Sequence, residues 1–488
     1  MSDRLRGDLI AGLTVWAVLV PEALAYAAIA GVSPVVGLYA APGALLLYAL
    51  LGSSRHLVTG PMAATAALSA ATVGDVVSAN SNAFTQLTIV LALCVGAAAL
   101  VAGLLRLGFL ASLISEPVLK GFVVGLALTI IVGQVQKLLG VDSGDGDFFE
   151  KLADLLGNLG STDALTLAVG GGTLVLVLGL RRVAPGVPGS LVAVALGIAL
   201  VEIFSLQDHG LDIVGKIDSG LPSFGLPDAK LSDYGALAPG AIGVMLVGFA
   251  EGLGAAKTYA SRNHYEIDPS RELIGLGAAN LASGLSSGMV VNGSLSKTAV
   301  NASAGARTQL SGVVVAAMTV VTLLFLTGLF ESLPEATLAG VVIAALIELV
   351  DFPALAAYRV YSKQLGRAYG VASRPDFIAA VAAMLGVLVF DTLPGPFIGI
   401  AISLVLLLYR VSRPRIARLG VVPGGTGQYA DLERHPENSE PDGVKVLRIE
   451  GGLFFPTPTR CARRCAGRPA SPASTRWCST PRRCRSST

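Results

Sequence analysis

Two carboxylates stand inside apolar segments of this chain, where a buried charge is costly. Glu22 follows Pro21 in the middle of the hydrophobic run Leu9–Ala30, and Glu251 lies inside another run, Ala241–Ala256. The first run is long enough to span a bilayer, and an ionisable residue inside such a run usually faces a partner, a cavity or a pathway. Because proline removes a backbone donor, we expect the helix to break beside Glu22 and free carbonyl groups there. The alternative is a protonated acid packed against a neighbouring helix.

Two short segments rich in small residues, Gly60–Gly74 and Gly293–Gly305, cannot span a membrane alone. Each begins with glycine after a polar or β-prone stretch, which is typical of a helix N-terminus. If the two N-termini meet, they present unpaired N–H groups and positive dipole ends to one space, which suits an anion. Two ordinary helices with glycine-lined contacts are the alternative. The predicted substrate-binding residues at these two ends are Gly60, Pro61, Met62, Ala63, Ser294, Leu295, Ser296 and Lys297.

Lys297 lies one turn into the second short segment. Its cation either adds to the dipole field that faces the gap or extends to the cytoplasmic surface without a specific role. Two acids beside an anion site are poor ligands while both are ionised, whereas burial favours the neutral form of a carboxylate. We therefore predict that Glu22 and Glu251 take part in proton coupling.

Composition places these residues in a polytopic, all-α membrane protein. Of 488 residues, 53% are hydrophobic and 14% are charged, compared with roughly 25% charged residues in soluble proteins. The net charge of +2 gives no reason to expect a nucleic-acid partner. We predict no enzyme activity, no cofactor and no metal site, because the histidines all lie in predicted loops. These are His56, His209, His264 and His435.

Hydropathy predicts fourteen membrane segments in two sets of seven. Because each set has an odd number, the two halves must have opposite topologies, which gives an inverted repeat. No cleavable signal peptide is recognisable at the start of the chain. The predicted segments are Leu9–Ala30, Pro34–Leu51, Gly60–Gly74, Phe84–Leu105, Val118–Leu139, Ala164–Leu180, Ser190–Phe204, Ala241–Ala256, Leu273–Ser287, Gly293–Gly305, Leu310–Phe330, Ala336–Val350, Phe377–Phe390 and Phe397–Tyr409.

The charges of the loops predict an orientation in the membrane. Alternate loops carry arginine and lysine, including Arg4, Arg55, Arg106, Arg181, Arg262, Arg307 and Lys363. The opposite loops are rich in acids, including Asp75, Asp145, Glu150, Asp208 and Asp233. Since cations concentrate in cytoplasmic loops, both termini should be cytoplasmic.

Several stretches resemble the sulfate permease (SulP) family, the bacterial relatives of solute carrier family 26. The stretch Val20–Ala27 resembles the first-helix signature, and Ser54–Pro61 resembles the start of the third helix. Asn280 and the stretch Gly293–Asn301 resemble the family's most characteristic region. The resemblance covers roughly residues 5 to 455.

The resemblance implies a fold shared with nucleobase transporters. A core domain of helices 1–4 and 8–11 moves against a gate domain of helices 5–7 and 12–14, with the anion between helices 3 and 10 and near Tyr26. The chain departs from the family in having Glu22 where glutamine is common and Lys297 where arginine is frequent. A titratable group at position 22 favours proton-coupled uptake, while lysine lacks the bidentate geometry that suits planar oxyanions. Met62 makes one wall of the site apolar and adaptable.

We therefore expect a secondary transporter for a small anion, namely sulfate, bicarbonate or a dicarboxylate such as fumarate. We expect transport to be coupled to protons and to proceed by elevator-like alternating access. The expected partners are membrane lipid and a second copy of the chain, with which it forms a homodimer. The alternatives are a nucleobase permease of the same fold and an uncoupled anion exchanger or channel.

The C-terminal region follows the resemblance only in part. We assign residues 1–412 to the transport domain, 413–442 to a linker and 443–458 to the start of a cytoplasmic STAS domain of α/β type. The remaining residues, 459–488, contain eight arginines and four cysteines but no Leu, Ile, Val, Phe or Met. A segment without an apolar face stays disordered, and the cysteine spacing is not that of a zinc site. We expect an incomplete STAS domain with a disordered tail.

Overall fold

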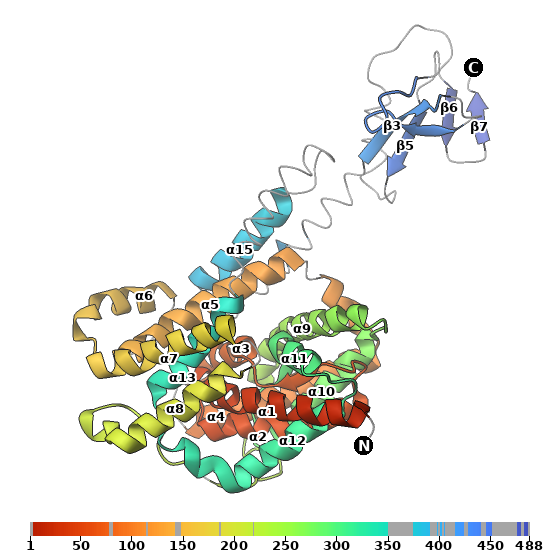
Figure 1. Ribbon diagram of the computed structural model, residues 1–488. Coiled ribbons are helices and arrows are strands. Elements are labelled where there is room, and N and C mark those ends of the chain that lie inside the picture. Colours follow the sequence, from red (N-terminus) through yellow and green to blue (C-terminus); the bar gives the residue numbers. More distant parts are fainter. Residues whose placement is uncertain are drawn as a thin grey trace. The chain divides into compact units, whose positions relative to one another are not determined.

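The computed structural model divides the chain into two units, Met1–Ser403 and Leu404–Thr488, and each is described by itself. It describes residues 3–77, 82–113, 116–141, 148–184, 187–217, 219–349, 374–390, 398, 401–402, 405, 415–423, 428–440, 446–450, 476–479 and 483–486. The first unit is helical, and Figure 1 labels its elements. In the described residues, seven helices are long and apolar enough to cross a membrane, and four apolar helices are shorter.

The helices of the first unit overlap every predicted segment up to Phe377–Phe390, although the helix Leu231–Arg262 extends well beyond the predicted Ala241–Ala256. The last predicted segment, Phe397–Tyr409, lies almost wholly outside the described residues. The helix α6 was not predicted, because it is short and amphipathic. The helices are α1 (Asp3–Ile29), α2 (Pro34–Leu51), α3 (Ala63–Gly74), α4 (Asn82–Leu104), α5 (Glu116–Leu139), α6 (Phe148–Gly157), α7 (Ala164–Val183), α8 (Gly189–Phe204), α9 (Leu231–Arg262), α10 (Pro269–Leu285), α11 (Leu295–Ser303), α12 (Leu310–Val321), α13 (Glu335–Leu349) and α15 (Arg374–Phe390).

The helices pack in two groups. In one group α10 contacts α2 and α4, α1 contacts α2 and α12, and α9 contacts α4; in the other α5 contacts α13 and α15, and α7 contacts α8 and α13. Glycine permits a close approach between α4 and α10. A Cβ atom built on Gly96 or on Gly277 would lie 2.9 Å from the backbone oxygen of the other glycine. Small residues at such contacts let helices pack closely in a membrane.

The predicted break beside Glu22 is wrong, because α1 continues through Pro21. Proline removes one backbone donor from the helix interior. Packing of α1 against α2, α11 and α12 holds the helix together, since neighbouring helices tolerate proline in membrane helices. Glu22 therefore lies on a continuous helix rather than at an unwound one.

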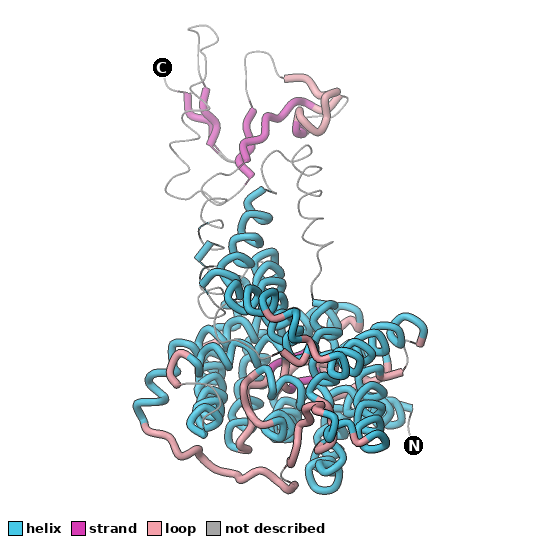
Figure 2. Tube along the Cα trace, turned by 90° about the vertical axis from the view of Figure 1, so that its left-hand side faces the viewer, coloured by secondary structure: helices cyan, strands magenta, loops and turns pink. Residues whose placement is uncertain are grey.

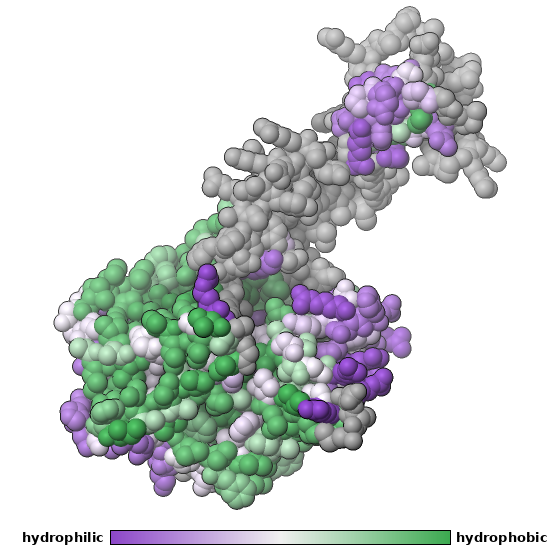
Figure 3. Space-filling model, viewed as in Figure 1, coloured by the Kyte–Doolittle hydropathy of each residue, from purple (hydrophilic) through white to green (hydrophobic). Residues whose placement is uncertain are grey.

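The outer surface of the first unit is apolar over much of one face. Figure 3 shows hydrophobic residues covering the area of α7 and α8, with hydrophilic residues gathered toward two edges of the unit. Large apolar side chains there are exposed, including Val175 at 72%, Val183 at 84% and Phe204 at 59%. An apolar surface of this kind marks contact with a membrane, as expected for an integral membrane protein.

Two short strands lie inside the helical unit, as the tube in Figure 2 shows. They are β1 (Val58–Gly60) and β2 (Asn292–Ser294), and they pair antiparallel. They come directly before α3 and α11, at the starts of the two short segments predicted to meet.

The second unit contains a three-stranded antiparallel sheet in the order β4-β3-β5. Its strands are β3 (Arg415–Val421), β4 (Tyr429–Asp431) and β5 (Val446–Glu450). Two of them, β3 and β4, lie in the region assigned to a linker, so this region is structured in part. The strand β5 falls at the predicted start of the STAS domain, and the identity of that domain stays a prediction.

The tail predicted to be disordered contains two short strands, β6 (Arg476–Ser479) and β7 (Arg483–Ser486), which pair antiparallel. This differs from the prediction of disorder for residues 459–488. A two-stranded hairpin by itself is at best marginally stable in water, so we still expect no cooperative folding unit there.

Candidate functional site

The pairing of β1 with β2 brings the two short helices together. Thr59 pairs with Gly293, and Gly60 pairs with Asn292. Because the strands are antiparallel, α3 and α11 leave opposite ends of the strand pair and run in opposite directions, each with its N-terminal end at the pair. The structure therefore places both helix N-termini at one centre, although they are far apart in the sequence.

Side chains of α11 fasten this centre. The Thr298 hydroxyl donates to the carbonyl of Ser294 at 2.5 Å and accepts from the amide of Val58 at 3.1 Å. Asn301 donates from Nδ2 to the carbonyl of His56 at 2.9 Å. Burial lowers the pKa of His56, in the loop before β1, and so favours the neutral imidazole.

Lys297 provides the positive charge of the site. Its side chain is 1% exposed, and its Nζ atom lies 2.7 Å from Oε2 of Glu22. The same atom donates to the carbonyl of Pro61 at 3.1 Å and lies 5.0 Å from the centroid of the Tyr26 ring, a cation–π distance. Glu22 and Tyr26 are four residues apart on α1 and so share a face. The alternative in which Lys297 extends to the cytoplasmic surface is wrong.

The remaining predicted residues form two different parts of the centre. Gly60, Met62 and Ala63 are buried at the start of α3, as is Pro61. At the start of α11, Ser294 is buried and its Oγ atom accepts from the amide of Lys297 at 3.3 Å. The following residues, Leu295 and Ser296, are exposed, so the centre has an accessible edge on the α11 side.

Glu251 lies behind β2 on α9. A Cβ atom built on its neighbour Gly252 would lie 3.0 Å from Oδ1 of Asn292, so α9 packs directly on this strand. The Oε2 atom of Glu251 is buried without a hydrogen-bond partner among the described residues. The two predicted proton-coupling residues thus differ in their surroundings. Glu22 forms an ion pair with Lys297, whereas Glu251 lies outside this ion pair.

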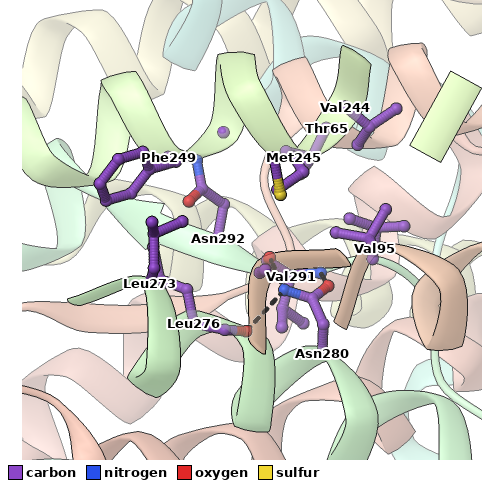
Figure 4. Close-up of a pocket in the computed structure, with 13 residues that line it drawn as sticks. Thr65, Val95, Val244, Met245, Phe249, Leu273, Leu276, Asn280, Val291 and Asn292 are labelled. Atoms are coloured by element: carbon purple, nitrogen blue, oxygen red, sulfur yellow. Dashed lines mark hydrogen bonds between the residues drawn. The ribbon is translucent and has the colours of Figure 1, made fainter. Parts of the chain in front are cut away.

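A small cavity lies between α9 and α10, beside β2. Figure 4 shows Phe249 and Met245 on one side, Leu273 and Leu276 on the other, and the side chain of Asn292 between them. Its volume of about 20 Å³ has room for about one water molecule. It is too small for an oxyanion and does not coincide with the centre around Lys297.

Sequence reasoning missed three polar residues of the centre, namely Asn292, Thr298 and Asn301. All three are at most 2% exposed. Polar side chains spaced three to four residues apart in a short helix could have indicated Thr298 and Asn301, since they share a face with Ser294. The role of Asn292 depends on the register of the strand pair and has no such signal.

Comparisons with known proteins identify the family of this chain. Residues 5–364 match the sulfate permease family. A probable sulfate transporter of Mycobacterium tuberculosis is 37% identical over 454 residues, which cover 92% of this chain and 78% of the relative. The chloroplastic sulfate transporter 4.1 of Arabidopsis thaliana is 32% identical over 469 residues, covering 93% of this chain and 65% of the relative.

Two solved structures share the fold. The murine solute carrier 26 family member A9 anion transporter in the inward-facing state matches with a TM-score of 0.80 and 21% identity, covering 95% of this chain and 78% of that one. The transmembrane domain of the cyanobacterial bicarbonate transporter BicA matches with a TM-score of 0.69 and 24% identity, covering 82% of this chain and 98% of that one. The relatives are named as transporters and not as enzymes, and this chain belongs to the sulfate permease family.

Proposed function

We propose that this protein is a secondary transporter that carries a small anion together with a proton across the bacterial inner membrane. The observation that carries the proposal is the buried ammonium group of Lys297, held where the N-terminal ends of α3 and α11 meet and paired with Glu22. Helix N-termini and a buried cation together favour an anion.

The ion pair explains why an anion and a proton would enter together. While Glu22 is ionised, it compensates the charge of Lys297 and repels an incoming anion. When Glu22 takes up a proton, Lys297 is left without compensation, and removing one partner of a buried pair is strongly unfavourable. An anion that binds beside Lys297 restores the balance. Proton and anion therefore stabilise each other in the site.

With a monovalent anion such as bicarbonate, this exchange of partners keeps the site neutral in both states, whereas sulfate or fumarate adds one further negative charge. The empty site holds Lys297 with ionised Glu22, and a site loaded with a monovalent anion holds Lys297, the anion and protonated Glu22. A neutral site is far less costly to move through a low-dielectric environment than a charged one. Both states can then cross the membrane by elevator-like alternating access. A site in which the charge of Lys297 is not compensated does not cross.

The substrate class follows from the relatives and the site. Sulfate is the first candidate, since the relatives of the chain are named as sulfate transporters. Bicarbonate is the second, because a bicarbonate transporter shares the fold, and a dicarboxylate such as fumarate is the third. A nucleobase would require polar groups that read a ring edge, whereas Met62, Ala63 and Leu295 offer apolar surface at this centre.

We also propose the wider architecture expected from the sequence. Fourteen spans in a seven-plus-seven inverted repeat are supported by the matched pairs β1–α3 and β2–α11, whose strands run in opposite directions. Cytoplasmic termini are supported by the charges of the loops. A homodimer in membrane lipid and a STAS domain in the second unit complete the proposal. Cysteine labelling at Asp145 and Lys363 should show opposite sides of the membrane, and labelling of both from one side would contradict it.

Counterflow in proteoliposomes tests the transport proposal. Vesicles with the purified chain are loaded with unlabelled sulfate, bicarbonate, fumarate or uracil and receive the labelled compound outside. We expect counterflow with at least one anion and none with uracil. Counterflow with uracil alone would assign the protein to nucleobase transport, and counterflow with none of the four would contradict the proposal.

A further inference from the structure

One helix outside the predicted site, α10, holds the loop that leads into β1. Glu272, in the first turn of α10, is fully buried. Its Oε1 atom accepts from the amides of Ser53 and Ser54 at 2.8 and 2.9 Å and from the Ser53 hydroxyl at 2.6 Å. Its Oε2 atom accepts from the hydroxyl of Tyr48, at the end of α2, at 2.7 Å. Three donors of the loop before β1 and one of α2 thus bind one carboxylate.

The same helix holds the loop that leads into β2. Asn280 accepts from the amide of Val291 at 3.0 Å and donates to the carbonyl of the same residue at 2.9 Å. Ser283, almost one turn further, donates to the carbonyl of Met289 at 2.5 Å. Figure 4 shows Asn280 directed from α10 toward Val291, next to Asn292. The backbone just before β2 is therefore fixed by side chains of α10.

Backbone packing supports this double attachment. A Cβ atom built on Gly275 of α10 would lie 2.8 Å from Cα of Gly52, where the loop to β1 begins. At the other end, a Cβ atom on Gly288 would lie 2.6 Å from the Ser283 hydroxyl. Both loops thus lie directly on α10, with no room for a side chain between them.

We propose that Glu272 and Asn280 are positioning residues for the anion site, which act by fixing β1 and β2 to one rigid helix. The two strands have three residues each, and an isolated two-stranded pair is marginal by itself. Glu272 and Asn280 are eight positions apart, which corresponds to about 12 Å along a helix axis. Through them α10 sets how far apart the N-terminal ends of α3 and α11 lie. This inference rests on the proposed anion transport.

The chain offers a matched control in Asp8, on α1. This carboxylate is also buried and also holds a loop, since it accepts from the amides of Arg307 and Thr308 at 2.6 and 3.0 Å and from the Thr308 hydroxyl at 2.6 Å. That loop follows α11 and leads into α12, not into β1 or β2. The next residue of this loop, Gln309, donates from Nε2 to the carbonyls of Ser54 and Leu57 at 2.9 Å each. Removing Asp8 therefore measures the cost of losing a buried loop anchor that acts on the chain before β1 through a neighbouring residue and not directly.

Sulfate uptake by Glu272→Met, Glu272→Gln and Asp8→Leu tests the proposal through KM and Vmax. Glu272→Met leaves the amides of Ser53 and Ser54 without an acceptor, and we expect KM to rise about tenfold. Glu272→Gln keeps one acceptor oxygen for these amides and should restore KM to within about threefold of the wild-type value. Asp8→Leu should lower the melting temperature as Glu272→Met does but raise KM much less, because its loop reaches the chain before β1 through Gln309 alone among the contacts described above. An unchanged KM in Glu272→Met, or an equal rise in Asp8→Leu, would overturn the proposal.

The other end of α10 supplies a second test if Glu272→Met does not assemble. Asn280→Leu removes both bonds to Val291 at similar volume, and KM should rise by a similar factor. Hydrogen exchange gives a readout that needs no substrate. Protection should fall at residues 53–60 in Glu272→Met, and less in Glu272→Gln or Asp8→Leu. It should fall at residues 290–296 in Asn280→Leu and not in Asp8→Leu. If the wild-type protein transports no anion, the proposed function fails; if these segments keep their protection, the attachment to α10 fails.

Discussion

The site has two arms, β1 with α3 and β2 with α11. Their strands pair and their helices are both short, but the two helices have different N-terminal residues. In the first arm, Met62 is the N-cap residue of α3, and no side chain among the described residues accepts from the first turn. The second arm begins α11 with Ser294, whose hydroxyl accepts from the Lys297 amide. The first four amides of a helix have no partner within it. We infer that the first arm offers free backbone donors to an anion, while the second arm offers the charge of Lys297.

The charge on the second arm should matter most. Lys297→Met removes the cation and leaves Glu22 buried without its partner, so we expect uptake to fall about a hundredfold and assembly to suffer. The double variant Lys297→Met with Glu22→Gln removes both charges and should assemble well while transport stays lost. Labelled sulfate uptake and size-exclusion profiles measure the two effects. Uptake by the double variant at the wild-type rate would contradict a role for Lys297 in binding.

A substitution at the exposed edge of the second arm should have the next largest effect on transport. Ser296→Trp fills the accessible side of the centre, and overpacking of this kind should weaken anion affinity about tenfold or more. Ser303→Trp is the control, since Ser303 is also exposed but lies at the other end of α11. Both proteins should assemble, and uptake should fall only in Ser296→Trp. Equal uptake by the two variants would place the anion elsewhere.

A substitution that occupies the free backbone donors of the first arm should have the smallest effect on transport. Met62→Ser introduces a capping hydroxyl at the start of α3, and such a cap is worth about 1 kcal/mol. It would compete with the anion for the same amides, so we expect affinity to fall about fivefold while the melting temperature stays equal or rises. Met62→Leu is the control without a hydroxyl. Tighter anion binding in Met62→Ser would show that the first arm does not use its backbone donors in this way.

Much of this architecture is predictable from sequence, because apolar runs and glycine-initiated short segments depend on local pattern. The ranges of α2, α3 and α4 and the meeting of two helix N-termini follow from such patterns. The pairing of Glu22 with Lys297 does not, since it depends on how α1 packs against α11. The same packing keeps α1 continuous at Pro21, where the local rule predicts a break. The attachment of both loops to α10 is also tertiary, and Glu272 resembles any acid in a first helical turn.

The central claim is that Glu22 carries the proton that enters with the anion, and Glu22→Gln tests it most directly. Glutamine keeps the shape of the side chain but cannot titrate, so the empty site retains the uncompensated charge of Lys297. Such a site should bind and exchange anions but return empty only slowly. In proteoliposomes with an inward proton gradient as the only driving force, we predict that the wild-type protein accumulates the anion. Glu22→Gln should lose accumulation while keeping counterflow. Accumulation by Glu22→Gln under the same gradient would contradict the account.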